Sequence, residues 1–204
     1  MHTTATLPRA AATRLPWVKI GIGVVVIGLI ILAYTRNPLA TTAVLSASLR
    51  QSTPIILGAL AGILCERAGI INIGIEGMML TAAFLGFLCN VWTGNLFLAV
   101  CGAMLAGGCT GALHALMSIT LRVDQIISGT VINILALGFT GYFYQQGLVT
   151  QGKLTAIEIP VLADLPLVGP VFFDNAPITY TALILVVIVH IMLFKTRWGL
   201  RTRA

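Results

Sequence analysis

The sequence predicts an all-α fold, a polytopic transmembrane bundle of about six helices, and two observations carry this prediction. Hydrophobic residues make up 58% of the chain and charged residues only 9%, and the mean hydropathy is +1.00. Such a composition excludes an ordinary soluble domain. Apolar runs also recur along the 204 residues, and a helix needs roughly 20 apolar residues to cross a bilayer.

The chain divides into a polar N-terminal tail, residues 1–16, and a transmembrane domain, residues 17–204. Arg50, Gln51 and Pro54 interrupt the second apolar run, which predicts a kinked or broken helix there. Segment 148–180 is polar and contains prolines, so it is expected to form a loop. The predicted spans are residues 17–34, 43–64, 69–89, 96–120, 125–147 and 178–194.

The distribution of lysine and arginine predicts the orientation. With the N-terminus inside, only Arg36 and Lys153 fall outside, and Arg50 lies within the second span. Basic loop residues favour the cytoplasmic side, so an inside N-terminus is predicted, and the basic charge reports orientation and not nucleic-acid binding. The inside residues are Arg9, Arg14, Lys19, Arg67, Arg122, Lys195, Arg197, Arg201 and Arg203.

The most informative stretch begins the third span and carries Asn72 and Glu76 in an apolar setting. A carboxylate inside a span is costly, and it is a functional-site hypothesis by default. If a helix begins near Gly69, Asn72 and Glu76 lie one turn apart on one face, with Glu76 about 10 Å from the helix start. Gly74 and Gly77 would let a ligand or another backbone approach. The alternative is that Glu76 snorkels or pairs with a neighbouring helix.

A second polar stretch opens the fifth span. Asp124 precedes an apolar helix and is expected to cap it, with Ser128, Thr130 and Asn133 in the first three turns. These side chains either line a pathway or only form hydrogen bonds within the bundle, and the sequence leaves both interpretations open. His114, in the fourth span, is expected to form an interhelical hydrogen bond.

No enzyme or metal site is expected. The four cysteines lack C-x-x-C spacing, and no His or carboxylate stands at ligand spacing from them. A Ser/His dyad, paired aspartates and a His-Glu-x-x-His motif are not found. The chain also lacks a phosphate-binding loop, so it has no nucleotide site of that kind.

Three stretches carry a resemblance to a known family. The run ERAGIINIGIEGMML over residues 66–80 resembles the signature of membrane permease subunits of ABC importers, in the group for simple sugars and nucleosides. That group is related to the ribose and branched-chain amino acid permeases. DQIISGTVINILALG, over 124–138, is similar to the same group, and KTRWGLRTRA, over 195–204, resembles the start of its ATPase-docking loop. The resemblance covers about residues 49–204 and implies the N-terminal portion of a permease.

The resemblance implies a multi-pass permease of a bacterial-type inner membrane, importing nucleosides or simple sugars. It implies an ABC ATPase subunit, a second permease subunit and an extracytoplasmic binding protein as partners, with ATP on the ATPase and no cofactor on this chain. The alternative is an ion-coupled secondary transporter in which Glu76 carries a proton. The substrate-path candidates are Asn72, Gly74, Glu76, Gly77 and Asn133. Structural or gating roles are expected for Glu66, Arg67, Asp124 and Ser128, and ATPase docking for Arg197, Arg201 and Arg203.

Overall fold

A computed structural model describes residues 15–144, 147–160, 162–163 and 165–202, and most of these residues lie in helices. In the described part of the chain six long helices follow one another, and a π-helical turn, η1, extends the fourth. Their bounds are α1 Leu15–Arg36, α2 Pro38–Arg67, α3 Ile75–Thr93, α4 Leu96–Ala115, η1 Leu116–Thr120, α5 Gln125–Phe143 and α7 Pro177–Lys195. The remaining elements are short: β1 Ile157–Glu158, α6 Val168–Phe172, β2 Asp174–Asn175 and α8 Arg197–Arg201.

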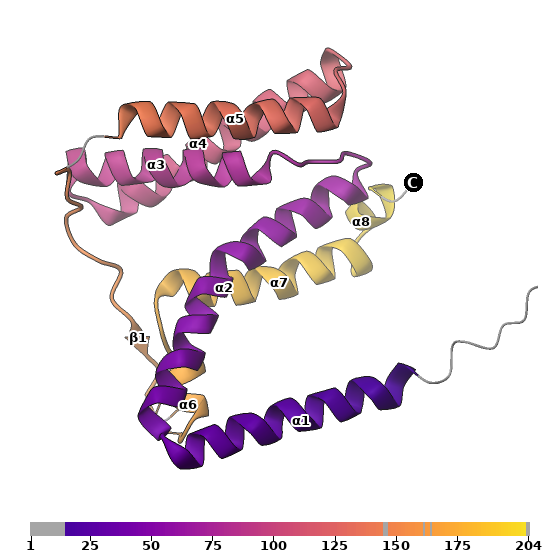
Figure 1. The fold of residues 1–204 in the computed structure, drawn as a ribbon. Helices are drawn as coiled ribbons and strands as arrows, with labels where there is room; N and C mark the ends of the chain where they lie inside the picture. Colours follow the sequence, from indigo (N-terminus) through magenta and orange to yellow (C-terminus); the bar gives the residue numbers. More distant parts are fainter. Residues whose placement is uncertain (1–14, 145–146, 161, 164, 203–204) are drawn as a thin grey trace, which may run out of the picture.

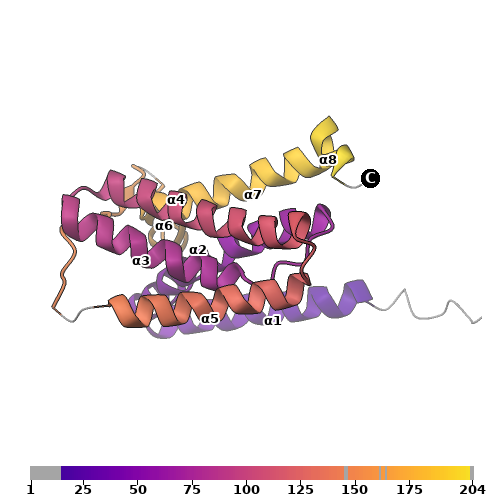
Figure 2. The same cartoon turned by 90° about the horizontal axis from the view of Figure 1, so that it is seen from above.

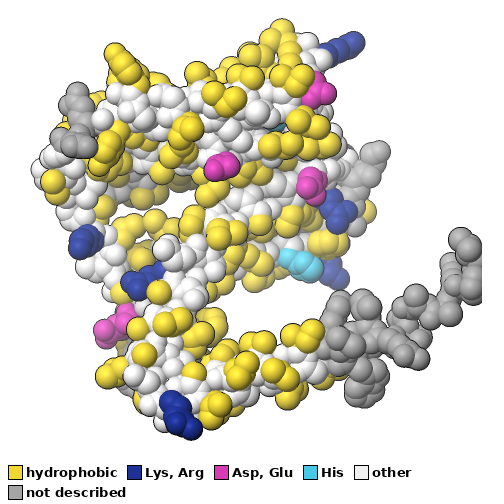
Figure 3. All heavy atoms as spheres, in the orientation of Figure 1, with side chains coloured by type: hydrophobic (Ala, Val, Ile, Leu, Met, Phe, Trp, Pro, Cys, Tyr) yellow, Lys and Arg dark blue, Asp and Glu magenta, His cyan; other side chains and the backbone are white. Residues whose placement is uncertain are grey.

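The helices form a membrane bundle. Five of them, including α4 with η1, are long and apolar enough to cross a membrane, and Ile20–Arg36 of α1 is a shorter apolar helix. Large hydrophobic side chains cover much of the surface, as Figure 3 shows. On α1, for instance, Val24 is 64% exposed and Leu29 is 60% exposed. A surface of this kind suits a hydrocarbon surrounding, which confirms the predicted polytopic helical fold.

The helices are arranged in two groups (Figure 1). Helices α3, α4 and α5 pack together, and α3 lies between the other two when the molecule is seen from above (Figure 2). Helix α2 packs on α7, and α1 packs on α2. The start of α1, the α4–α5 loop and α8 lie at one edge, and the α5–α7 segment lies at the other (Figure 1).

Small residues set the contacts between helices. A Cβ atom on Gly58 of α2 would lie 3.0 Å from the sulfur of Met79 in α3, and Gly62 faces Ile75 in the same way. On α3, a Cβ atom on Gly86 would lie 2.9 Å from that of Ala103 in α4. Close approach at small residues replaces the hydrophobic effect as the source of helix association in lipid.

The sequence predicts a helix that is kinked or broken near Pro54. Helix α2 is not broken there; it continues for 30 residues and bends (Figure 1), which agrees with the first alternative. Proline removes one N–H donor, and the buried Thr53 helps to anchor this part of the helix, because its hydroxyl lies 3.3 Å from that of Thr179 in α7. Helix α5 ends at Phe143, before the predicted boundary at residue 147.

The predicted loop between the last two spans is folded over the end of α2. The two strands pair antiparallel, with Ile157 opposite Asn175. Helix α6 packs on α2, where the Ser46 hydroxyl donates to the Pro170 carbonyl at 3.0 Å. Asn175 is 1% exposed and its amide donates to the Val171 carbonyl at 2.8 Å. Helix α6 and strand β2 are therefore packed on this end of the bundle.

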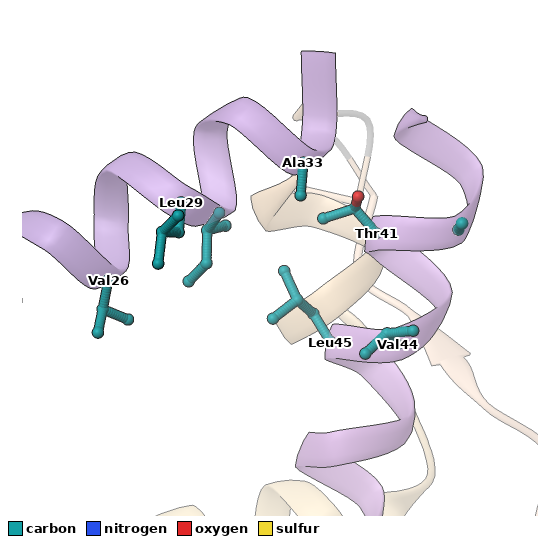
Figure 4. Close-up of a pocket in the computed structure, with 8 residues that line it drawn as sticks. Val26, Leu29, Ala33, Thr41, Val44 and Leu45 are labelled. Atoms are coloured by element: carbon teal, nitrogen blue, oxygen red, sulfur yellow. The ribbon is translucent and has the colours of Figure 1, made fainter. Parts of the chain in front are cut away.

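An apolar hollow of about 400 Å³ lies in the corner between α1 and α2 (Figure 4). Among the described residues that line it, Thr41 is polar and the others are apolar: Val26, Leu29, Ile30, Ala33, Ala40, Val44 and Leu45. It lies across the α2–α7 pair from α3–α5 (Figure 1). A lining of this kind offers a polar solute almost nothing to bind.

Candidate functional site

The third span does not begin where the sequence predicts. Residues 68–74, which we call the α2–α3 linker, are not helical, and α3 begins at Ile75 instead of Gly69. Gly69 has a left-handed φ of 76°, which ends the path of α2. Asn72 and Glu76 therefore do not share a helix face. The Asn72 side chain instead turns back on the linker, where its Oδ1 accepts from the Gly74 N–H at 3.0 Å.

Non-helical backbone inside a membrane protein needs hydrogen-bond partners from elsewhere in the protein, and α5 supplies them. The Ile71 N–H donates to Gln125 Oε1 at 2.6 Å. The Asn133 amide binds at two points: its Nδ2 donates to the Ile73 carbonyl at 3.1 Å, and its Oδ1 accepts from the Gly77 N–H at 2.7 Å. Asn133 thus caps the start of α3 from a different helix.

Between these two side chains, the linker and α5 touch backbone to backbone. A Cβ atom on Gly129 would lie 2.7 Å from the Gly74 nitrogen, and one on Gly77 would lie 2.7 Å from the Asn133 Cα. Gln125, Gly129 and Asn133 are spaced four residues apart, so they form one face of α5. This face holds the linker from Ile71 to the first turn of α3.

The same contacts fix how far Glu76 lies from the start of α5, measured along the helix axis. Gly77 lies level with Asn133, eight residues into α5, which is about 12 Å along that helix. The sequence predicts nearly the same depth, about 10 Å, but attributes it to a helix that starts at Gly69. Glu76 lies in the first turn of α3, where the positive end of the helix dipole favours a carboxylate.

Glu76 opens onto a hollow of about 250 Å³ between α3 and α5, which we call the Glu76 hollow. The Glu76 side chain is exposed and forms no hydrogen bond or ion pair with any residue that the structure describes. Asn133 has one amide proton and one oxygen lone pair left after its bonds to Ile73 and Gly77. The hollow is lined by Glu76, Gly77, Leu80, Asn133, Ile134 and Leu137.

The structure brings together four of the five substrate-path candidates, but in different positions. Glu76, Gly77 and Asn133 line the hollow, and Gly74 lies behind it against Gly129. Asn72 has its side chain turned into the linker and is absent from the lining.

Two of the four residues for which structural or gating roles are expected lie at the start of α5. Asp124 caps α5 as predicted, because its Oδ1 accepts from the N–H groups of Ile126 and Ile127. Ser128 is 6% exposed and lies 3.1 Å from Nδ1 of His114, the interhelical bond expected of that histidine.

The remaining predicted residues lie near the end of α2 and the end of the chain. Glu66 and Arg67 close α2 and are exposed, and the Arg67 guanidinium lies 5.7 Å from the centre of the Phe194 ring. Arg197 and Arg201 are the first and last residues of α8 and are exposed. Arg203 lies outside the described residues.

Sequence reasoning missed Gln125 and Gly129 as parts of the site. A glutamine and a glycine in the first turns of an apolar helix carry no signal of their own. Their four-residue spacing with Asn133 is visible in the sequence, and this spacing was the available hint of a common face.

Comparisons with known proteins agree with the three sequence stretches. A family described as "Branched-chain amino acid transport system / permease component" matches residues 44–204. The nucleoside ABC transporter permease protein NupC of Lactococcus lactis is 34% identical, over 75% of this chain and 52% of its own length. The guanosine ABC transporter permease protein NupQ of Bacillus subtilis is 36% identical, over 79% and 54%. A putative glucose ABC transporter permease protein of Haloferax volcanii is 35% identical, over 76% and 49%.

The chain spans about half the length of the curated relatives that it matches. No solved structure matches it. The family match begins at residue 44, so α1 and the first turns of α2 lie outside it, whereas the linker, α3 and α5 lie within it.

Proposed function

Because the chain belongs to the permease-component family of branched-chain amino acid transport systems, we propose that its protein is the membrane permease of an ATP-driven importer of nucleosides or simple sugars. In this proposal the chain contributes part of the translocation path in a bacterial-type cytoplasmic membrane. ATP binds to a separate ATPase subunit, a second permease completes the path, and an extracytoplasmic binding protein delivers the substrate. Arg197, Arg201 and Arg203 face the ATPase.

The observation that carries the proposal is the set of hydrogen-bonding groups at the Glu76 hollow. A carboxylate accepts hydrogen bonds from two neighbouring hydroxyls, and the amide of Asn133 can add one donor and one acceptor. Ribose and hexoses present adjacent hydroxyls of this kind. The apolar side chains of Leu80, Ile134 and Leu137 suit the flat or less polar face of such a ligand.

The hollow is less suited to the amino acids in the family's description. An amino acid brings a carboxylate, which needs a cation or free N–H groups, and the described lining has no lysine or arginine. At the N-terminus of α3, the N–H groups of Gly74 and Gly77 are already bonded to Asn72 and Asn133. Glu76 also stands at this helix end and repels a second carboxylate. The chemistry therefore favours a neutral, hydroxyl-rich substrate.

Two of these relatives are named as nucleoside and guanosine transporter permeases, and a third is named as a putative glucose transporter permease. These names support the same substrate class for this protein. They do not distinguish a nucleoside from a sugar, and the hollow as described accommodates hydroxyls of either.

Uptake by the complete permease tests the proposal. The full-length protein and the ATPase and binding protein encoded with it are reconstituted, and the entry of labelled guanosine, glucose and leucine is measured. We expect saturable, ATP-dependent uptake of guanosine or glucose that a hundredfold excess of leucine does not inhibit. Saturable uptake of leucine alone would overturn the substrate class. Uptake driven by an ion gradient without the ATPase would support the secondary-transporter alternative instead.

A further inference from the structure

The α4–α5 contact contains a buried histidine that has no part in the proposed substrate path. His114 is 3% exposed, and its Nδ1 lies 3.1 Å from the Ser128 hydroxyl, which is 6% exposed. Among the described residues, this is the one hydrogen bond between side chains that joins α4 to α5. The π-helical turn η1 follows directly after His114 and Ala115. Such turns inside helices often occur at functional sites.

The environment of His114 is costly if its role is only to fill space. Its Nε2 is buried and has no hydrogen-bond partner among the described residues, and the same holds for the Ser118 hydroxyl one turn later. A buried polar atom without a partner lowers stability, and an apolar side chain of similar size would avoid this cost. The bond from His114 to Ser128 is therefore expected to have a role that outweighs this cost.

The Ser128 end of that bond lies next to the part of α5 that contacts the α2–α3 linker. Ser128 precedes Gly129, whose backbone touches Gly74 so closely that a Cβ atom there would lie 2.7 Å from the Gly74 nitrogen. One turn further along α5, Asn133 holds Ile73 and Gly77. A contact this tight leaves α5 little room to rotate or slide without moving the linker with it.

We propose that His114 is a positioning residue for the Glu76 hollow: by holding Ser128, it fixes the rotation of α5, and α5 in turn fixes the linker and the start of α3. The proposal deepens the proposed function, on which its transport arm rests. His114 itself does not line the hollow and touches no substrate. Its effect reaches Glu76 through Ser128, Gly129 and Asn133.

The test uses two variants of the full-length permease, assembled with its ATPase. His114→Leu removes the bond to Ser128 and keeps an apolar side chain in the buried space. His114→Asn keeps a polar atom near the position of Nδ1 and omits the rest of the ring. Hydrogen exchange is measured for the peptides that cover residues 71–77 and, as an internal reference, for those that cover α7, which has no part in this chain of contacts.

In His114→Leu we expect exchange at residues 71–77 to rise about tenfold or more while exchange in α7 stays unchanged. The substrate concentration at half-maximal uptake should rise severalfold, with maximal uptake per assembled complex falling less. His114→Asn should restore most of both values. Unchanged exchange at residues 71–77 in His114→Leu would overturn the proposal, and so would an equal rise in α7, which indicates general destabilisation.

The exchange arm needs no transport, so the inference and the proposed function fail separately. Loosening of residues 71–77 in a protein that takes up neither nucleosides nor sugars supports the positioning role and rejects the substrate class. If exchange at residues 71–77 is unchanged in a variant whose nucleoside uptake is normal, the positioning role is rejected and the proposed function stands.

Discussion

Glu76 is the residue on which the proposed substrate chemistry depends. It is an exposed carboxylate in the first turn of α3, without a partner among the described residues, and it opens onto a hollow between two helices. The helix dipole offsets part of its cost, and the hollow gives it access to a ligand or to water. A carboxylate held only for stability would be expected to have a salt-bridge or hydrogen-bond partner.

In the full-length permease, Glu76→Gln keeps the shape of the side chain and part of its hydrogen bonding, whereas Glu76→Leu removes both charge and hydrogen bonding. Hydrogen bonds to a charged group contribute about 1.5–3 kcal/mol, so we expect Glu76→Leu to reduce specific uptake by roughly 10- to 100-fold, with a smaller loss for Glu76→Gln. Membrane abundance and ATPase binding should change little. Normal uptake per assembled complex in Glu76→Leu would show that Glu76 has no role in the path.

Gly129 tests the close contact between α5 and the linker. Gly129→Ala places a methyl group 2.7 Å from the Gly74 nitrogen, where neither backbone has space to yield. Overpacking of this kind costs about 1–3 kcal/mol. We therefore expect a lower melting temperature and faster hydrogen exchange at residues 71–77.

Gly138→Ala is the matched control, because it makes the same change in the same helix where nothing lies within 4 Å of the new methyl group. It should be neutral or slightly stabilising, since alanine is the better helix former. Equal melting temperatures for the two variants would contradict the close contact described for Gly129.

At the scale of the elements, the linker is the part of the fold that depends most on distant residues. Its backbone groups at Ile71 and Ile73, and the N–H of Gly77 in the first turn of α3, are bonded to side chains that lie 54 to 60 residues away in the sequence. We expect Gln125→Leu to leave the Ile71 N–H without its partner and Gln125→Glu to keep an acceptor in place. Hydrogen exchange at Ile71 should rise in the first variant and stay close to wild type in the second. Slow exchange in both would mean that Gln125 does not hold the linker.

The sequence predicts the helices better than the linker, for a physical reason. Span positions follow from hydropathy, so the predicted segments 96–120 and 178–194 agree closely with α4–η1 and α7. Asp124 as the cap of α5 is likewise a local signal, and the structure confirms it. The apolar composition of the linker does not distinguish it from the first turns of a membrane helix. Its non-helical path depends on hydrogen bonds to Gln125 and Asn133, and no local sequence pattern connects these two residues to the linker.

At the scale of the whole molecule, the arrangement of the edges allows a test of orientation. The start of α1, the α4–α5 loop and α8 share one edge, while the α3–α4 turn and the α5–α7 segment share the other (Figure 1). This is the alternation that six crossings produce. The positive-inside count predicts that the first edge is cytoplasmic, since it gathers most of the basic residues outside the spans.

Reporter fusions after residues 92, 123, 160 and 204 examine this orientation directly. Alkaline phosphatase folds only outside the cytoplasm, so it should be active after residues 92 and 160 and silent after 123 and 204. A cytoplasmic reporter at the same positions should give the reverse pattern. The fusion after residue 160 is the most decisive, because it follows β1 in the segment between α5 and α7, which is predicted to lie outside. A silent phosphatase there would invert the assignment and remove α8 from the side on which an ATPase binds.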